Sequence, residues 1–134
     1  MRRINITRGE TEKFMTKPEA PHGGLCLDLD TIDQELRQVE PYRRDGHTAR
    51  TLLRAPDLRV VLIVMKAGSR MAEHRADESA SVHVISGHVR LHLPERIAEV
   101  HEGQLLLLER DLAHDVEAVT DSALVLTLGW HGNS

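Results

Sequence analysis

A chain of 134 residues is long enough for one domain, which would bury roughly two thirds of its unfolded surface in a single core. Its 17 Lys and Arg residues and 21 Asp and Glu residues give a formal charge of -4, with the two signs interleaved and no basic run. This balance argues against a nucleic-acid partner and against an anionic membrane surface.

The apolar stretches are all shorter than the roughly 18 residues that a membrane span needs, and Met1-Arg2-Arg3 is followed by polar residues instead of a secretory apolar region. Cys26 is the lone cysteine, which rules out an internal disulfide and fits a reducing compartment. We therefore expect a cytoplasmic protein with no membrane partner. Cys26 lies in an alternating run over 25–29, so we expect a short strand or extended segment with Cys26 as a small packed side chain.

Nine histidines raise the expectation of metal or proton chemistry, because imidazole titrates near neutral pH and binds metals. The three aromatic residues, Phe14, Tyr42 and Trp130, leave little surface for stacking on sugars or bases. The core is therefore predicted to be aliphatic.

Residues 1–24 have no sustained apolar period and contain two prolines and the pair Gly23-Gly24, which predicts a loosely held arm. A sharper alternative is a strand built on Arg3–Thr7 that is exchanged between the subunits of a dimer. In either case residues 1–46 form an N-terminal arm with a covering helix, and residues 47–134 form a barrel, within a single domain.

One short helix is predicted before the barrel. Thr31 and Gln34 make a capping-box pair, in which each side chain can bond a backbone amide of the first turn. An apolar stripe follows at helical spacing, and Pro41 ends the helix. The stripe consists of Ile32, Leu36 and Val39. A single apolar stripe on an otherwise charged helix indicates that the helix covers another part of the protein.

From His47 onward, apolar residues recur with a period of 2, and turn residues separate roughly eight strands at spacings of about 8 to 12 residues. This pattern predicts an all-β sandwich, barrel or jelly roll, since the lack of a long helix among the strands excludes a parallel α/β sheet. The predicted strands are 47–53, 58–65, a strand that ends near Gly87, 88–94, 97–100, 104–108, 112–119 and 123–130.

The strand Leu58–Met65 is apolar on both faces except at Arg59, so both faces are expected to be covered. The barrel core would cover one face, and either the arm or a second subunit would cover the other. This strand is the reason to predict a homodimer.

Ser86-Gly87 suits a tight turn with a positive φ, so the strands on either side are predicted to pair as a two-residue hairpin. In that register apolar residues share one face and polar residues share the other. The apolar face holds Val82, Val84, Val89 and Leu91, and the polar face holds Ser81, His83, Arg90 and His92. His83, His88 and His92 are therefore expected to be solvated or to lie at a dimer face, with a surface cluster as the alternative.

The stretch Gly68–Gly87, followed by Gly103 and His114, resembles the two sequence motifs of the cupin superfamily of small jelly-roll barrels. Gly68, His74 and Gly87 match two glycines and the first histidine of the first motif, and Gly103 and His114 match the second motif. The resemblance covers about half of the chain directly and implies an all-β fold, a small antiparallel jelly-roll barrel. Residues 46–68 also look like part of a group of small stand-alone bacterial cupins with no settled activity.

The chain departs from the cupin motifs at two of the four metal ligands. The resemblance implies a site of three histidines and one glutamate, of which this chain keeps His74 and His114. Ala76 stands at the second histidine and Ala80 at the glutamate. The other departures are Glu109 and Asp111 at a proline and a glycine, and Ala118 at an asparagine.

Two function hypotheses follow. The preferred one is a small-molecule-binding or sensor-type cupin without a complete metal site, whose ligand occupies a cavity around His74, Ala76, Ala80 and His114. The alternative is a metal-dependent enzyme of dioxygenase or isomerase type, in which Glu78 joins His74 and His114 to hold Fe, Mn, Ni or Zn. An acid/base pair of the two histidines would need a third, orienting group. No Gly-x-Ser-x-Gly, Walker-type or Gly-x-Gly-x-x-Gly motif occurs, which argues against hydrolase and nucleotide chemistry.

Overall fold

The computed structural model describes residues 24–74 and 77–129, and at residues 73 and 74 it describes the backbone. Within this part of the chain two short helices precede nine strands. The helices are α2 (Leu29–Leu36) and α3 (Glu40–Asp45). The strands are β1 (His47–Arg54), β2 (Leu58–Met65), β3 (Arg70–His74), β4 (Ala80–Ser86), β5 (His88–His92), β6 (Ile97–His101), β7 (Leu105–Leu108), β8 (His114–Ala118) and β9 (Ser122–Gly129). Neither helix is long and apolar enough to cross a membrane.

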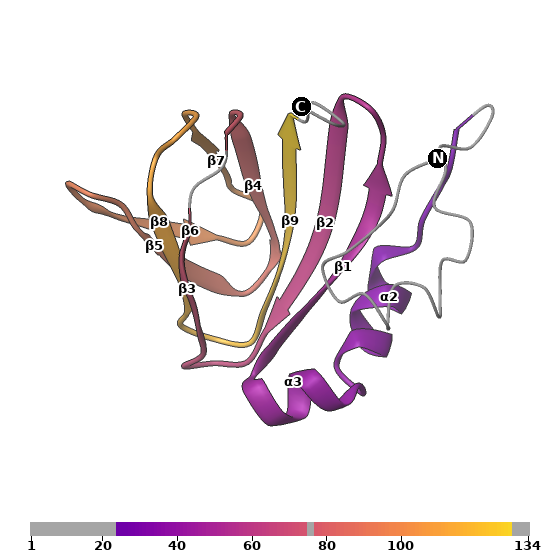
Figure 1. Ribbon diagram of the computed structural model, residues 1–134. Helices are drawn as coiled ribbons and strands as arrows, with labels where there is room; N and C mark the ends of the chain where they lie inside the picture. Colours follow the sequence, from indigo (N-terminus) through magenta and orange to yellow (C-terminus); the bar gives the residue numbers. More distant parts are fainter. Residues whose placement is uncertain (1–23, 75–76, 130–134) are drawn as a thin grey trace.

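The strands form two sheets that face each other (Figure 1). One sheet has five strands in the order β1-β2-β9-β4-β7, and the other has four strands in the order β3-β8-β5-β6. All the pairs are antiparallel. The all-β jelly-roll fold predicted from the sequence is therefore confirmed, and β3 is a strand of its own that separates the second predicted strand from β4.

The space between the sheets is filled by aliphatic side chains. The alternating inward residues of β2 and β9 meet those of β5 and β8 in one cluster, because successive side chains of a strand point to opposite faces. The buried members are Ala49, Val61, Ile63, Met65, Val82, Val84, Val89, Leu91, Ala98, Val100, Leu108, Val116, Ala118 and Leu124. The cluster holds no aromatic residue, as the composition predicts.

A second apolar cluster lies on the outer face of the five-stranded sheet. Leu36 from α2 and Tyr42 from α3 pack there against Leu62 and Val64 of β2, and Figure 1 shows both helices beside β1. The ion pair between Arg50 Nη1 of β1 and Glu35 Oε1 of α2, at 3.0 Å, fastens the helix to the sheet. The second face of β2 is thus covered from within the chain by the helical segment, and β2 gives no reason to invoke a second subunit.

The helical segment differs in detail from the sequence prediction. Asp28 caps α2, accepting hydrogen bonds from the backbone amides of Asp30 and Thr31, so the helix begins earlier than a Thr31 capping box would allow. Pro41 does not end a helix but lies in the first turn of α3, where its missing N–H costs nothing. Residues 25–28 form no strand, and Cys26 is exposed instead of packed.

The predicted hairpin around Gly87 is wrong. β4 pairs with β7 and β9 in one sheet, whereas β5 pairs with β6 and β8 in the other. Gly87, with φ 90°, turns the chain from the first sheet into the second. The predicted burial is nevertheless confirmed, since the four valine and leucine residues flanking the turn are all buried.

Gly87 also sits against a backbone that leaves no room for a side chain. A Cβ at this position would overlap Ser122 Oγ and the carbonyl oxygen of Asp121. Ser122 Oγ itself accepts from the His88 amide at 3.0 Å, so it joins the two sheets at this corner. Its own proton has the Thr120 carbonyl at 2.8 Å and the His88 carbonyl at 3.2 Å as alternative acceptors. The corner therefore requires glycine for both its φ and its volume.

We predict that Gly87→Ala destabilises the protein more than Gly103→Ala does. Both glycines have a positive φ, which costs a non-glycine residue roughly 1–2 kcal/mol. Only Gly87 adds an overlap, worth roughly 1–3 kcal/mol more, because a Cβ at Gly103 meets nothing within 4 Å. Urea unfolding of the two variants measures the difference, and equal losses would contradict this account of the corner.

Candidate functional site

Several strand ends meet at one end of the barrel, which we call the upper barrel end because it lies uppermost in Figure 1. β1, β3, β7 and β9 finish there, and β2, β4 and β8 begin there. The residues at these ends are Arg54, Leu58, His74, Ala80, Leu108, His114 and Gly129. Of the candidate site residues, His74, Ala80 and His114 therefore lie at this end, while the aliphatic cluster fills the barrel below it.

His74 and His114 are brought together by strand pairing. The last residue of β3, His74, is the register partner of His114, the first residue of β8. The His114 side chain is buried, as the alternation of β8 predicts, and its Nδ1 lies 2.9 Å from the carbonyl oxygen of Leu112. Because a carbonyl only accepts, Nδ1 carries the proton in this contact.

The other predicted site residues occupy different positions. Ala80 is partly buried at the start of β4, between Leu108 of β7 and Leu128 of β9 in the sheet register. Ala76 lies outside the described residues. Glu78 lies against Gly129, with its Oε1 3.9 Å from the place where a Cβ of that glycine would stand.

The ligand set implied by the cupin resemblance is not assembled by the described part of the chain. Among those residues no three histidine, cysteine, aspartate or glutamate side chains come together in a way that could hold a metal ion. Gly129 pairs with Leu58 of β2, which shares the outward side with Val60 and Leu62, so Glu78 packs near the outward side of the sheet. His114 faces the other way, into the barrel.

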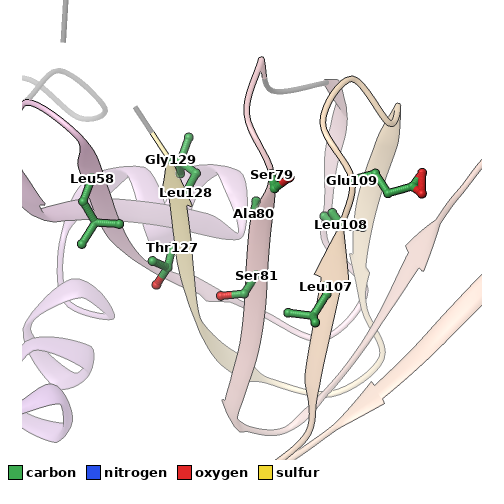
Figure 2. Close-up of a pocket in the computed structure, with 10 residues that line it drawn as sticks. All are labelled: Leu58, Ser79, Ala80, Ser81, Leu107, Leu108, Glu109, Thr127, Leu128 and Gly129. Carbon is green, nitrogen blue, oxygen red and sulfur yellow. The ribbon is translucent and has the colours of Figure 1, made fainter. Parts of the chain in front are cut away.

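A groove of about 500 Å³ adjoins the upper barrel end on the five-stranded sheet (Figure 2). Its walls come from the ends of β2, β9, β4 and β7, and they are mostly apolar. The lining residues are Leu58, Ser79, Ala80, Ser81, Leu107, Leu108, Glu109, Thr127, Leu128 and Gly129. Ala80 thus links the groove to the barrel end.

Two arginines at the upper barrel end were not among the candidate residues. Arg54 of β1 and Arg59 of β2 are direct register partners. Arg59 alternates with Val61 and Ile63, which lie in the aliphatic cluster, so both guanidinium side chains belong to the inward face. Burial, and next the charge of Arg54, lower the pKa of Arg59. The signal in the sequence was a lone charge in an otherwise doubly apolar strand.

The outward histidines do not form one group. His83 is exposed on the five-stranded sheet, whereas His88 and His92 lie on the outer face of the four-stranded sheet. His88 Nε2 is 2.6 Å from Glu99 Oε1, and the His88 ring stacks on His101 at 4.0 Å between centroids. His92 Nε2 lies 2.9 Å from Glu117 Oε1. Since these partners are carboxylates on the neighbouring strands, the two histidines belong to a network of polar side chains that crosses the strands.

The sequence model of the AraC-like ligand binding domain matches residues 59–130, which is more than half of the chain. The chain belongs to this family. The matched region runs from the second residue of β2 to the end of β9, so it includes every strand except β1, as well as Arg59 and His114. No curated protein sequence matches the chain.

Solved structures agree with the family on the fold. A conserved protein of unknown function from Streptococcus pyogenes is similar over 97% of this chain and 96% of its own, at 23% identity and a TM-score of 0.66. A cupin superfamily protein from Desulfitobacterium hafniense shares 10% identity over 85% and 96% of the two chains, with a TM-score of 0.64. Salicylate 1,2-dioxygenase from Pseudoaminobacter salicylatoxidans is similar over 84% of this chain but 34% of its own, at 17% identity and a TM-score of 0.70. The family member described here thus has the fold of a small cupin.

We predict that Glu99→Gln destabilises the protein at neutral pH and has little effect at acidic pH. The hydrogen bond from His88, and then that from Arg90, hold the pKa of Glu99 below its ordinary value of 4.5. A lowered folded-state pKa contributes stability above the unfolded-state pKa, and this stability is lost as the pH falls through the folded-state value. Urea midpoints of wild type and Glu99→Gln, measured from neutral pH down to below the folded-state pKa of Glu99, test this prediction. Glu102→Gln, in the adjacent turn, is the control. If the urea midpoint of Glu99→Gln is lower than that of wild type by the same amount at every pH, the electrostatic cause is contradicted.

Proposed function

We propose that this protein is a ligand-binding, sensor-type cupin whose small-molecule ligand occupies the upper barrel end around His74, Ala76, Ala80 and His114. The observation that carries the proposal is the buried His114, whose ring is held by the Leu112 carbonyl in the inward face of a chain that belongs to a ligand-binding family. A fixed imidazole among aliphatic walls can orient a polar ligand by a single hydrogen bond.

The replacements in the cupin motif support binding over catalysis. Ala80 stands where the resemblance implies a glutamate, and it leaves an apolar surface shared with the groove of Figure 2. A small side chain at this position enlarges the space for a ligand and removes a carboxylate from the site. The ligand would then be recognised by shape, by His114 and by other polar groups at the barrel end.

A metal-dependent enzyme of dioxygenase or isomerase type is the second candidate, because His74 and His114 are register partners and two imidazoles could share one Fe, Mn, Ni or Zn ion. A catalytic metal usually has three protein ligands. Glu78 would have to leave its position against Gly129 to become the third. The metal hypothesis therefore requires a rearrangement that the ligand-binding hypothesis does not.

We predict that Ala80→Trp weakens ligand binding, whereas Ala67→Trp, in the exposed turn after β2, does not. A library of small organic acids, sugars and amino acids is tested by thermal shift, and the affinity of each compound that raises the Tm is then measured in both variants. We expect Ala80→Trp to weaken binding about tenfold or more, since forcing extra volume into a packed site costs roughly 1–3 kcal/mol and about 1.4 kcal/mol corresponds to tenfold. Equal binding by both variants would place the ligand elsewhere.

The same preparation, purified without chelator, decides between the two candidates. Elemental analysis that finds Fe, Mn, Ni or Zn near one per chain, and no metal in the His74→Ala, His114→Ala double variant, would replace the sensor proposal with the enzyme. Ligand binding by protein without stoichiometric metal would sustain the sensor proposal. A cytoplasmic location and the division into an arm over 1–46 and a barrel over 47–134 stay predictions.

A homodimer is still our proposal, but on a different surface from the one that first suggested it. β7 is one edge of the five-stranded sheet, and its outward Leu105 and Leu107 are 58% and 71% exposed. An apolar edge strand is self-complementary, since two antiparallel copies can pair and extend one sheet into the next. The occupant we assign to this edge is therefore a second copy of the chain.

We predict that the protein is a dimer at micromolar concentration by light scattering and that Leu107→Glu makes it a monomer. The matched control is Ile97→Glu, because Ile97 is 52% exposed on β6, the edge of the other sheet. A monomeric wild-type protein would remove the dimer proposal. Dissociation by Ile97→Glu alone would move the interface to β6.

A further inference from the structure

The groove of Figure 2 lies on the outward face of the five-stranded sheet, and its lining includes no residue of α2 or α3. Ser81 and Thr127 are next in sequence to Val82 and Leu126, which point into the aliphatic cluster. Since successive side chains of a strand alternate between faces, both hydroxyl side chains point outward. Ser81 is the register partner of Thr127 on one side and of Leu107 on the other. β9 and β4 therefore supply a floor of small side chains.

Two exposed leucines form the opposite walls of the groove. Leu58 of β2 is 36% exposed, and Leu107 of β7 is 71% exposed. Because β9 and β4 lie between these strands, the walls are three strand spacings apart, about 14 Å. An exposed carboxylate stands beside each wall, since Asp57 directly precedes Leu58 and Glu109 lies two residues after Leu107. The groove is thus an apolar trough with an acidic residue near each end.

The described part of the chain begins on this same face of the sheet. Leu27 and Leu29, before and at the start of α2, pack against the outer cluster together with Val60 of β2. Val60 is the register partner of Thr127, which lies in the floor of the groove. Residues 1–23 precede this point, and an extended chain advances up to about 3.3–3.6 Å per residue. The N-terminal residues of the same chain are therefore long enough to reach the groove.

Residues 3–7 have the side chains and the length to fill the groove. Ile4 and Ile6 alternate with polar residues, so an extended segment would present both isoleucines on one side. Five extended residues span about 16–17 Å, close to the distance between the two leucine walls. Arg3 and Arg8 stand on either side of the isoleucines, and the first eight residues include no acidic residue. The segment therefore complements the groove in apolar character, in length and in the sign of its charges.

We propose that residues 3–7 of this chain dock in the groove as an extended segment that lies across the strands, with Ile4 and Ile6 against the floor between Leu58 and Leu107. Docking removes apolar surface of both partners from water, and the flanking arginines come near the carboxylates at the two walls. The dimer proposed above uses the backbone edge of β7, whereas the segment uses the face of the sheet. Because the proposed ligand lies inside the barrel, this docking does not depend on the ligand.

Disulfide trapping in the full chain, in dilute solution with a mild oxidant, tests the proposal. Ser81→Cys, at the centre of the groove, is combined with Ile4→Cys or Ile6→Cys in a Cys26→Ser background. The matched control is Asn5→Cys, because alternation directs residue 5 away from the groove. A disulfide needs Cβ atoms about 3.5–4.5 Å apart. We therefore expect a crosslinked monomer to form several times faster from residue 4 or residue 6 than from residue 5.

The other outcomes of the trapping experiment each overturn the proposal. Equal rates from residues 4, 5 and 6 would mean that the segment meets the groove by random collision. Absence of a crosslink from all three would place the segment elsewhere. A crosslinked dimer in place of a crosslinked monomer would assign the groove to the N-terminal segment of a second copy.

A measurement without introduced cysteines provides a second criterion. We expect the Ile4→Ser, Ile6→Ser double variant to have a lower urea midpoint than wild type, because it loses the buried isoleucine side chains. The control is the Asn5→Ser, Thr7→Ser double variant, whose changes lie on the other side of the segment and should leave the midpoint unchanged. Equal midpoints in wild type and both double variants would show that the isoleucines are not buried and would overturn the docking.

Discussion

The burial of β2 and β9 on both faces is the constraint on which the rest of the structure depends. Their inward residues form the core with the four-stranded sheet, and their outward residues pack under α2 and α3. A central strand pair in this position cannot tolerate a polar residue on either side except near its ends. Arg59 stands at such an end, where β2 begins, and its charge marks the point at which the core gives way to the candidate site.

The two covering layers explain which surfaces remain open. The helices cover the sheet over β2 and β9 and are anchored at β1 by the Arg50–Glu35 pair, but they do not reach β7. The aliphatic cluster fills the barrel but ends at the row of Arg59, Leu128 and Ala80. The apolar edge at β7 and the upper barrel end are therefore two places where the described part of the chain offers a surface to something else. We assign the first to a second copy and the second to a ligand.

The position of Ala80 at the upper barrel end gives a physical interpretation to one departure from the cupin motif. Alanine in place of the expected glutamate at residue 80 removes a carboxylate from the inward face of the upper barrel end. The same substitution weakens the case for a metal and leaves an apolar surface that a ligand could contact.

The sequence by itself determined what depends on local periodicity. Alternation placed most of the strands to within a few residues, identified the double burial of β2 and the inward position of His114, and correctly separated buried from solvated residues around Gly87. It could not determine which strands pair, because alternation assigns the faces of a strand and not its neighbours. The tertiary structure was needed to show that β4 and β5 belong to different sheets, that His83 is therefore separated from His88, and that Arg54 is the register partner of Arg59. Those pairings depend on burying both sheets and the helices at once, a condition that no local segment contains.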